Sequence, residues 1–259
     1  METPVRAEPI ISVRDLAKRY DRVVALDGVS FDLEPGSATV LVGRSGAGKT
    51  TLLRCINGLE RPTSGTVTVF GEDVDALDGA GLRRLRQRIG FVFQGFNLVG
   101  RATALENVLS GALGRIRGPR YGVMSYGAAM RREAMNHLER VGLADQAFQR
   151  ADTLSGGQQQ RVAIARMLFQ KPDLVLADEP VASLDPETAR QVLDLLVELC
   201  DEAGLTMLCS LHQLALAQGW ADRIIGLRDG RVVLDRPGSE LTRSEALEVY
   251  GNGPAGEEA

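Results

Sequence analysis

Residues 43–50, "GRSGAGKT", have the types and spacing of a loop that holds phosphate groups. Its three glycines allow backbone N–H groups to turn inward around phosphate oxygens, and the helix that follows adds the positive end of its dipole. Lys49 would reach the β and γ phosphates, and Thr50 would place its hydroxyl on Mg²⁺. The apolar run before the loop and the helical run after it are the context that this motif requires. We therefore predict that nucleotide is bound by Gly43, Arg44, Ser45, Gly46, Ala47, Gly48, Lys49, Thr50 and Thr51.

A phosphate loop does not by itself imply hydrolysis, because hydrolysis also needs an acidic element that holds the metal and prepares water. The stretch "LVLADEP" supplies such an element. Its apolar residues predict a buried strand, and Asp178 and Glu179 follow at the carboxyl end, where ligands of parallel sheets collect. We expect Asp178 to bind Mg²⁺ and Glu179 to act as general base. The alternative is an ordinary strand end whose acids are solvated.

A second stretch, "LSGGQQQRVAIAR" at 154–166, also has the features of an anion site. Ser155 is a natural N-cap, and Gly156 with Gly157 leaves the first helical turn without side chains, so we expect its N–H groups to face outward. The apolar residues that follow recur at helical spacing, toward a core. The alternative is that bare glycines mark close packing against another backbone. One chain thus carries two devices for phosphate.

Strands and helices must position these motifs, and the pattern of the chain predicts them. From residue 10 to about 76, short β-rich runs broken by Gly, Pro and Asp surround one helix, "KTTLLRCING". From about 98 to 153, helical patterns take over in "TALENVLSGALG" and "YGAAMRREAMNHLERVGL". After 159, strands and helices alternate as in βαβ units, and "RIIGLRDGRVVLD" predicts a hairpin that turns on Asp229 and Gly230. The fold class is therefore α/β.

Composition excludes several broad classes of protein. The 259 residues are 44% hydrophobic and 25% charged, which allows a sizeable core. The net charge of −4 argues against a surface built mainly for nucleic acid. No run approaches the roughly 18 to 20 apolar residues that cross a bilayer, and the first ten residues lack the apolar core of a signal peptide, so we expect the chain to stay in the cytosol. Three cysteines without CxxC spacing predict small core residues rather than disulfides or zinc ligands.

Together with the phosphate loop and the acidic strand end, "LSGGQ" resembles the signature of the ATP-binding cassette (ABC) superfamily. The resemblance spans essentially residues 10–250. It implies a single nucleotide-binding domain with a RecA-like P-loop core, an antiparallel β subdomain and an inserted α-helical subdomain. In that family the signature meets the γ-phosphate held by a second cassette. The residues that would serve the partner's ATP are Ser155, Gly156, Gly157 and Gln158.

The resemblance also implies the extents of these parts. We place the catalytic core with its β subdomain at 10–97 and 159–250, and the helical subdomain with the signature at 98–158. Residues 251–259 read as a flexible tail.

Two residues resemble the family's motifs on either side of the phosphate loop. Tyr20, in "KRYDRVVALDGVSF", resembles the aromatic that stacks on adenine; the alternative is that a lone aromatic after a strand packs in the core. Gln94, in "GFVFQGFNLV", resembles the glutamine that joins Mg²⁺ and the attacking water to the helical subdomain. The chain departs from the pattern of the family that it resembles at Gly95, where glutamine is usual; this change removes no phosphate ligand.

Two further residues follow the signature. Asp185, in "VASLDPET", resembles the aspartate that reaches across the paired cassettes, although before Pro186 it could merely cap a helix. His212, in "CSLHQ", resembles the histidine that contacts the γ-phosphate, although a histidine at a strand end is often structural. Our catalytic set is therefore Lys49, Gln94, Glu179 and His212, and our metal set is Thr50, Gln94 and Asp178.

Longer stretches, among them "LLRCINGLERPTSG" and "FQGFNLVGRATALENVL", resemble the ATPase subunit of bacterial phosphonate importers. This resemblance implies an ATPase that uses ATP and Mg²⁺ and pairs head to tail with a second copy of itself. It also implies transmembrane permease subunits, a periplasmic or lipoprotein substrate-binding protein, and no nucleic acid. The chain would lie peripherally on the cytoplasmic face of the inner membrane.

We expect the membrane subunits around Gln94 and the helical subdomain that follows it. Basic runs at 83–88 and 115–120 lie nearby in sequence. Each run is either a solvated face or a contact with a partner or with lipid headgroups.

Other functions stay open on the sequence alone. The cassette could energise import of another small solute, such as an amino acid or phosphate. It could also be a soluble ABC ATPase that acts on nucleic acid, ribosomes or repair complexes, but such proteins commonly fuse two cassettes or insert coils or zinc modules, which this chain lacks. A phosphate-loop kinase is a third alternative, in which "LSGGQ" would have no role.

Overall fold

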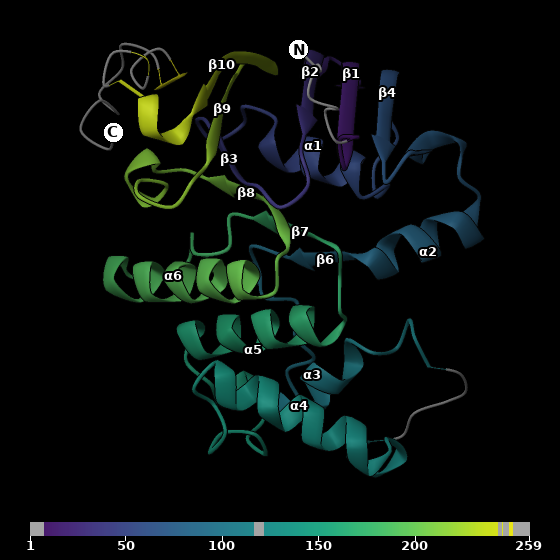
Figure 1. Ribbon diagram of the computed structural model, residues 1–259, viewed down its shortest axis with the longest axis vertical. Helices are drawn as coiled ribbons and strands as arrows, with labels where there is room; N and C mark the ends of the chain where they lie inside the picture. Colours follow the sequence, from purple (N-terminus) through teal and green to yellow (C-terminus); the bar gives the residue numbers. More distant parts are fainter. Residues whose placement is uncertain (1–7, 117–121, 243–244, 246–248, 251–259) are drawn as a thin grey trace, which may run out of the picture. The chain divides into compact units, whose positions relative to one another are not determined.

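The chain divides into two units, which we describe one at a time in the computed structural model (Figure 1). The structure describes residues 8–116, 122–242, 245 and 249–250. The first unit comprises Met1–Leu85 and Gly204–Ala259, and the second comprises Arg86–Ala203. The helical subdomain predicted at 98–158 is a smaller division, and its boundaries stay a prediction; the predicted tail lies outside the described residues.

The first unit contains a four-stranded antiparallel sheet, as predicted. Along its first strand Ile11, Val13 and Leu16 are fully buried, and an irregularity in register between the last two keeps all three side chains on the core face. Ile11 lies opposite Leu33 on one neighbouring strand and opposite Val69 on the other. The strands lie in the order β2 (Val23–Leu33), β1 (Ile11–Tyr20), β4 (Ser64–Val69) and β5 (Glu72–Asp73).

The first unit also contains the strands that carry the phosphate loop. β3 (Ala38–Val42) pairs in parallel with β8 (Thr206–Leu211) on one side and β9 (Arg223–Arg228) on the other, and β3 and β8 are almost entirely buried, as parallel strands require. β9 turns back into β10 (Arg231–Pro237) through Asp229 and Gly230, whose φ angles of 49° and 77° confirm the predicted hairpin. The helix α1 (Lys49–Ile56) follows the loop.

The second unit combines a parallel strand pair with helices. β6 (Ile89–Val92) pairs with β7 (Leu174–Asp178). The central helix α5 (Gly156–Phe169) contacts α3 (Ala104–Ser110), α4 (Ala128–Arg140) and α6 (Pro186–Glu202) (Figure 1). Residues 162–165 of α5 are all buried, as expected for a helix enclosed on every side. In the described part of the chain, no helix combines the length and apolar character that crossing a membrane demands.

The sequence patterns did not predict α2 (Gly79–Arg88) or β6. The basic run at 83–88 lies within α2, where Arg83 and Arg84 are exposed. Arg88 is also exposed and pairs with Asp173 at 2.7 Å. Exposure fits both a solvated face and a contact with a partner or with lipid headgroups, so the choice between them stays a prediction for this run. The run at 115–120 lies outside the described residues from 117 onward.

All three cysteines are buried and free, which confirms the prediction that they are small core residues. Burial raises the pKa of Cys55 to about 11 and that of Cys200 to about 12. Because only the thiolate is nucleophilic, neither side chain is reactive near neutral pH.

Candidate functional site

The phosphate loop follows β3 and owes its shape to glycine. Gly46 and Gly48 have φ angles of 81° and 104°, a region that other residues rarely adopt. At Gly43, a Cβ atom would lie 2.3 Å from the carbonyl oxygen of Leu227 in β9. At Gly48, a Cβ would lie 2.4 Å from the carbonyl oxygen of Ala25 in β2. The loop is therefore seated directly against the backbone of two strands.

The hairpin turn of the first unit braces the same loop. Gly230 donates its N–H to the carbonyl oxygen of Ala47 at 3.2 Å, and its own carbonyl oxygen accepts from the N–H of Asp27 at 2.8 Å. Because these restraints run from backbone to backbone, they do not depend on any flexible side chain.

Lys49 lies inside the loop and is only 3% exposed. Its Nζ donates to the carbonyl oxygens of Gly43 at 2.7 Å and Arg44 at 3.3 Å. An ammonium carries three protons and no acceptor, so Lys49 is a donor of the kind that suits an anion. Thr50 lies in the first turn of α1, which holds no acidic side chain to neutralise the helix dipole. The loop is thus a positively charged cradle.

Tyr20 and His212 complete the predicted residues of the first unit. Tyr20 is 39% exposed, so the core-packing alternative is wrong, and the Lys18 ammonium lies 4.8 Å from its ring centroid. His212 directly follows β8 and is half-buried. Val42 pairs with Leu211, so the phosphate loop and His212 leave the same edge of the parallel strands.

The acidic pair of the second unit ends β7. Asp178 is 5% exposed and Glu179 is 7% exposed, so these are not the solvated acids of an ordinary strand end. Glu179 has a φ of 47°, a strained conformation of the kind that clusters at functional sites. Val92 of β6 pairs with Ala177, so Gln94, two residues beyond β6, comes off the same edge as the two carboxylates.

The loop after Gln94 has two successive left-handed residues, Phe96 with φ 56° and Asn97 with φ 50°. Arg166 of α5 donates to both of their carbonyl oxygens, at 3.0 Å for Phe96 and 2.6 Å for Asn97. Burial lowers the pKa of Arg166 from its usual value. Sequence analysis missed Arg166, because nothing in the helical pattern of α5 indicates which carbonyl groups a buried arginine will meet.

The start of α5 differs in part from the prediction that the N–H groups of its first turn all face outward. Ser155 Oγ accepts from the Gln158 N–H at 3.3 Å, and Gln158 Oε1 accepts from the Ser155 N–H at 2.9 Å, so the first turn is capped rather than left entirely open. A Cβ at Gly157 would lie 2.5 Å from Thr188 Cγ2 of α6. Gly157 is therefore closely packed, but against a side chain and not against another backbone as the alternative expected.

Asp185 caps α6, as its alternative interpretation expected. Its Oδ1 accepts from the Thr188 N–H at 3.0 Å, and this hydrogen bond holds the pKa of Asp185 below its usual value. Thr188 thus joins the aspartate cap to Gly157 within the second unit.

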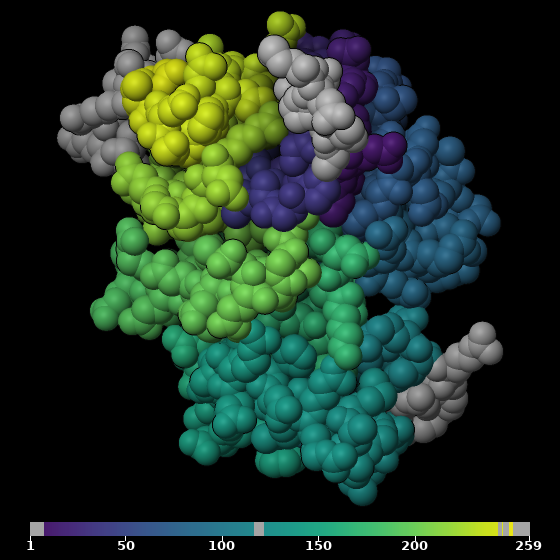
Figure 2. All heavy atoms as spheres, in the orientation of Figure 1, coloured from purple at the N-terminus to yellow at the C-terminus, as the bar shows by residue number. Residues whose placement is uncertain are grey.

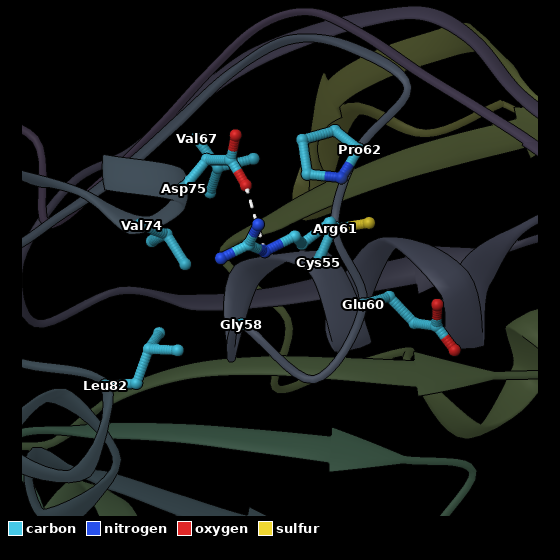
Figure 3. Close-up of a pocket in the computed structure, with 9 residues that line it drawn as sticks. All are labelled: Cys55, Gly58, Glu60, Arg61, Pro62, Val67, Val74, Asp75 and Leu82. Atoms are coloured by element: carbon cyan, nitrogen blue, oxygen red, sulfur yellow. Dashed lines mark ion pairs between the residues drawn. The ribbon is translucent and has the colours of Figure 1, made fainter. Parts of the chain in front are cut away.

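Two hollows lie away from these residues. In the first unit, a cavity of about 20 Å³ beside Cys55 is spanned by Arg61 and Asp75, which pair at 3.7 Å (Figure 3). That volume suits a single water rather than a ligand. In the second unit, an open hollow of about 680 Å³ lies beside α3 and α4. The atoms of these two helices are teal in Figure 2. Met124 and Phe148 on its lining are 79% and 72% exposed.

Comparisons with known proteins find relatives over most of the chain. The sequence profile of the ABC transporter family matches residues 26–182. The chain is 60% identical, over 95% of its length and 94% of the relative's, to the phosphate-import ATP-binding protein PhnC of Mycolicibacterium smegmatis. It is 58% identical, over 96% of its length and 93% of the relative's, to the phosphonates import ATP-binding protein PhnC of Nocardia farcinica.

Solved structures give the same result. A dimeric bacterial ABC transporter cassette matches with a TM-score of 0.78 and 36% identity, over 88% of this chain and 98% of that one. A dimeric cassette in a post-hydrolysis state, bound to ADP and Pi, matches with a TM-score of 0.77 and 35% identity over the same shares. These likenesses confirm the predicted fold class.

Proposed function

This chain belongs to the ABC transporter family, and from that premise we propose that it is the ATP-binding and hydrolysing subunit of a bacterial importer for phosphonates or a related phosphorus oxyanion. The observation that carries the proposal is that one chain holds both a glycine-built phosphate cradle, in its first unit, and a buried acidic pair at a strand end, in its second. The choice of solute follows the names of relatives that are 58% to 60% identical, one of which names phosphate.

ATP is the substrate of the cradle. Backbone N–H groups of the loop would enclose its phosphates, and Lys49 would turn its ammonium from the Gly43 carbonyl oxygen to the β and γ phosphates. Tyr20, with its exposed ring, would stack on adenine. The remaining loop residues, Arg44, Ser45, Gly46, Ala47, Gly48 and Thr51, shape or flank the cradle.

The oxygen donors present fit a magnesium ion. The Thr50 hydroxyl, the Gln94 amide oxygen and the buried Asp178 carboxylate are the hard ligands that Mg²⁺ takes, together with phosphate oxygens. When bound, Mg²⁺ would neutralise charge on the β and γ phosphate oxygens.

The protein's own part in hydrolysis is to orient water and move a proton. Glu179 would accept the proton of the attacking water, and Gln94 would orient that water. His212 would donate to the γ-phosphate from the sheet edge that it shares with the loop. The strained backbone of Glu179 supports this assignment, because such strain persists where the surrounding structure holds it for a purpose.

We further propose that two copies of the chain complete each other's sites. Each copy has one phosphate loop and one signature, so a two-fold pair holds two complete sites only if loop and signature meet across the interface. Ser155, Gly156, Gly157 and Gln158 would then face the partner's γ-phosphate, and Asp185 would reach across. The dimeric cassettes among the similar structures support this arrangement.

In the assembled importer the chain would lie peripherally on the cytoplasmic face of the membrane, beneath the permease subunits. A periplasmic or lipoprotein substrate-binding protein would deliver the solute to those subunits. The open hollow of the second unit supports a permease contact there. Its exposed Met124 and Phe148 offer apolar surface, and Arg131 and Arg132 add charge at its wall.

The decisive experiment distributes two substitutions over the dimer in two ways. When Lys49→Ala and Ser155→Arg sit on different chains, sharing between copies leaves one intact site. When both sit on one chain beside a wild-type partner, sharing leaves none. We expect hydrolysis from the first heterodimer and almost none from the second, each purified away from homodimers; the reverse order would show that each chain works alone.

The solute requires a transport assay. With the matching permease and binding subunits in vesicles, uptake of phosphonates, phosphate, phosphite and amino acids should show a preference for a phosphorus oxyanion. A preference for amino acids would overturn the assignment of solute but not that of the ATPase.

A further inference from the structure

The last described residues of the chain end at the histidine loop of the first unit. Val249 and Tyr250 are only 1% and 5% exposed. Tyr250 donates its hydroxyl proton to the carbonyl oxygen of His212 at 2.7 Å. Tyr250, which lies 38 positions after His212 in the chain, is thus hydrogen-bonded to the backbone of the histidine that we assign to the γ-phosphate.

A glycine in β9 provides the seat for this segment. A Cβ at Gly226 would lie 2.5 Å from Val249 Cγ2, so only glycine leaves room for the valine. Gly226 pairs with Val42, the last residue of β3 before the phosphate loop. Val249 therefore packs over β9, the strand next to β3, which carries the phosphate loop. This packing fixes the backbone position of the neighbouring Tyr250.

A second anchor holds the segment upstream. Arg236 of β10 pairs with Glu245 at 3.1 Å. The Glu245 carboxylate also accepts from the Thr242 hydroxyl at 2.7 Å and the Thr242 N–H at 3.0 Å, and the Glu245 N–H donates back to the Thr242 hydroxyl at 3.3 Å. This reciprocal pattern is that of a capping box. Glu245 is thus tied to the hairpin five residues before Tyr250.

We propose that Tyr250 is a positioning residue for His212, an inference that rests on the proposed role of His212 at the γ-phosphate. Its hydrogen bond holds the carbonyl group of His212, in the short connection between β8 and the 3₁₀ helix Leu214–Leu216. Since the carbonyl group and the imidazole share one Cα, fixing the carbonyl restricts the direction of the ring. Tyr250 touches no reacting atom and acts only through the histidine.

The first test substitutes Tyr250→Phe in the full chain, assembled with its membrane subunits. The ring keeps its packing and only the hydroxyl is lost. We expect kcat for ATP to fall about fivefold, as for one lost neutral hydrogen bond, while KM for ATP stays unchanged because the cradle is intact. Tyr126→Phe, the same change at a buried tyrosine of the second unit, is the matched control and should leave kcat unaltered.

A double-mutant cycle with His212→Ala then separates positioning from general loosening of the fold. If Tyr250 acts through His212, adding Tyr250→Phe to His212→Ala should cost no further activity. Independent losses that multiply would overturn the proposal, as would an unchanged kcat in Tyr250→Phe. If His212→Ala alone kept full activity, the proposed role of His212 would fail first, and this result is distinguishable from the other two.

Hydrogen exchange gives a measurement that does not depend on turnover. Backbone amides of Gln213 and Leu214 should exchange faster in Tyr250→Phe than in the wild type, while those of the phosphate loop stay unchanged. Equal exchange at the histidine loop would show that the hydroxyl does not restrain it, and would also overturn the proposal.

Discussion

The phosphate loop of the first unit and the glutamine loop of the second are both tight segments at the ends of parallel strands, but they are held by different means. In the phosphate loop every left-handed residue is a glycine, and the loop rests on strand backbone. In the glutamine loop the left-handed residues are Phe96 and Asn97, and the guanidinium of Arg166 holds their carbonyl oxygens.

This difference indicates a division of labour. Glycine reaches a left-handed conformation without strain, so the phosphate loop is already shaped for its ligand. A non-glycine residue held there costs about 1–3 kcal/mol, so the glutamine loop keeps its shape only while side-chain bonds offset that cost. A loop of this second kind can respond to what occupies the site. We therefore expect damage to the first loop to weaken ATP binding and damage in the second unit to slow turnover.

The largest effect should come from Glu179→Gln. Losing the general base should lower kcat roughly 10²- to 10⁴-fold, while ATP binding, which we assign to the first unit, should stay intact. Stopped-flow hydrolysis in the reconstituted transporter measures kcat, and a nucleotide-binding titration measures the affinity for ATP. Light scattering with ATP should reveal a trapped dimer. Full hydrolysis would refute the base assignment and remove the contrast between the units.

Gly48→Ala should show the opposite pattern. The new methyl group would meet the Ala25 carbonyl oxygen at 2.4 Å, at a φ of 104°. A strain of about 1–3 kcal/mol corresponds to a rise in the Kd for ATP of about 5- to 150-fold. Gly46→Ala is the matched control, because its Cβ has no neighbour within 4 Å and only the φ of 81° is strained. If both variants bound ATP equally, contact with the strand would not shape the loop.

Arg166→Lys tests the side-chain restraint on the glutamine loop. Lysine keeps the charge but lacks the planar fork that reaches both carbonyl groups. We expect kcat to fall about tenfold, with the Kd for ATP within about twofold of wild type. Arg140→Lys, on the exposed face of α4, provides the control for the same exchange. Weaker ATP binding with an unchanged kcat would contradict the proposed division between the loops.

The phosphate loop was predictable because its signal is local. Glycines, lysine and threonine at fixed spacing between a strand and a helix specify both a conformation and a ligand. The hairpin at Asp229 and Gly230 was predictable for the same reason, since the residues that turn the chain are themselves the pattern.

The roles of Arg166 and Tyr250 were not predictable, because their partners lie 70 and 38 residues away in the chain. These partners are backbone carbonyl oxygens, which every residue has, so no residue type marks them in the sequence. Gly157 shows a subtler limit. Its small size was correctly noticed in the sequence, but Thr188, the side chain that it accommodates, belongs to a different helix. The helix α2 was missed because its basic residues read as a charge run and not as one face of a helix.

The smallest effect concerns His137, whose ring meets the edge of Phe169 at a centroid distance of 5.8 Å within the second unit. Burial, aided by Arg140, lowers its pKa below the usual 6.5, so the folded state prefers the neutral ring. As pH falls below about 6.5, the unfolded chain takes up a proton that the folded chain does not, and the free energy of unfolding drops until the lower, folded pKa is passed.

His137→Gln should flatten this drop, by less than the roughly 1.4 kcal/mol per pH unit that one proton allows. Urea unfolding of both proteins across this pH range measures the difference, which should vanish above about pH 7. A difference of the same size at every pH would mean that His137 contributes by packing alone. ATP turnover at neutral pH, which depends on the loops compared above, should be the same in both proteins.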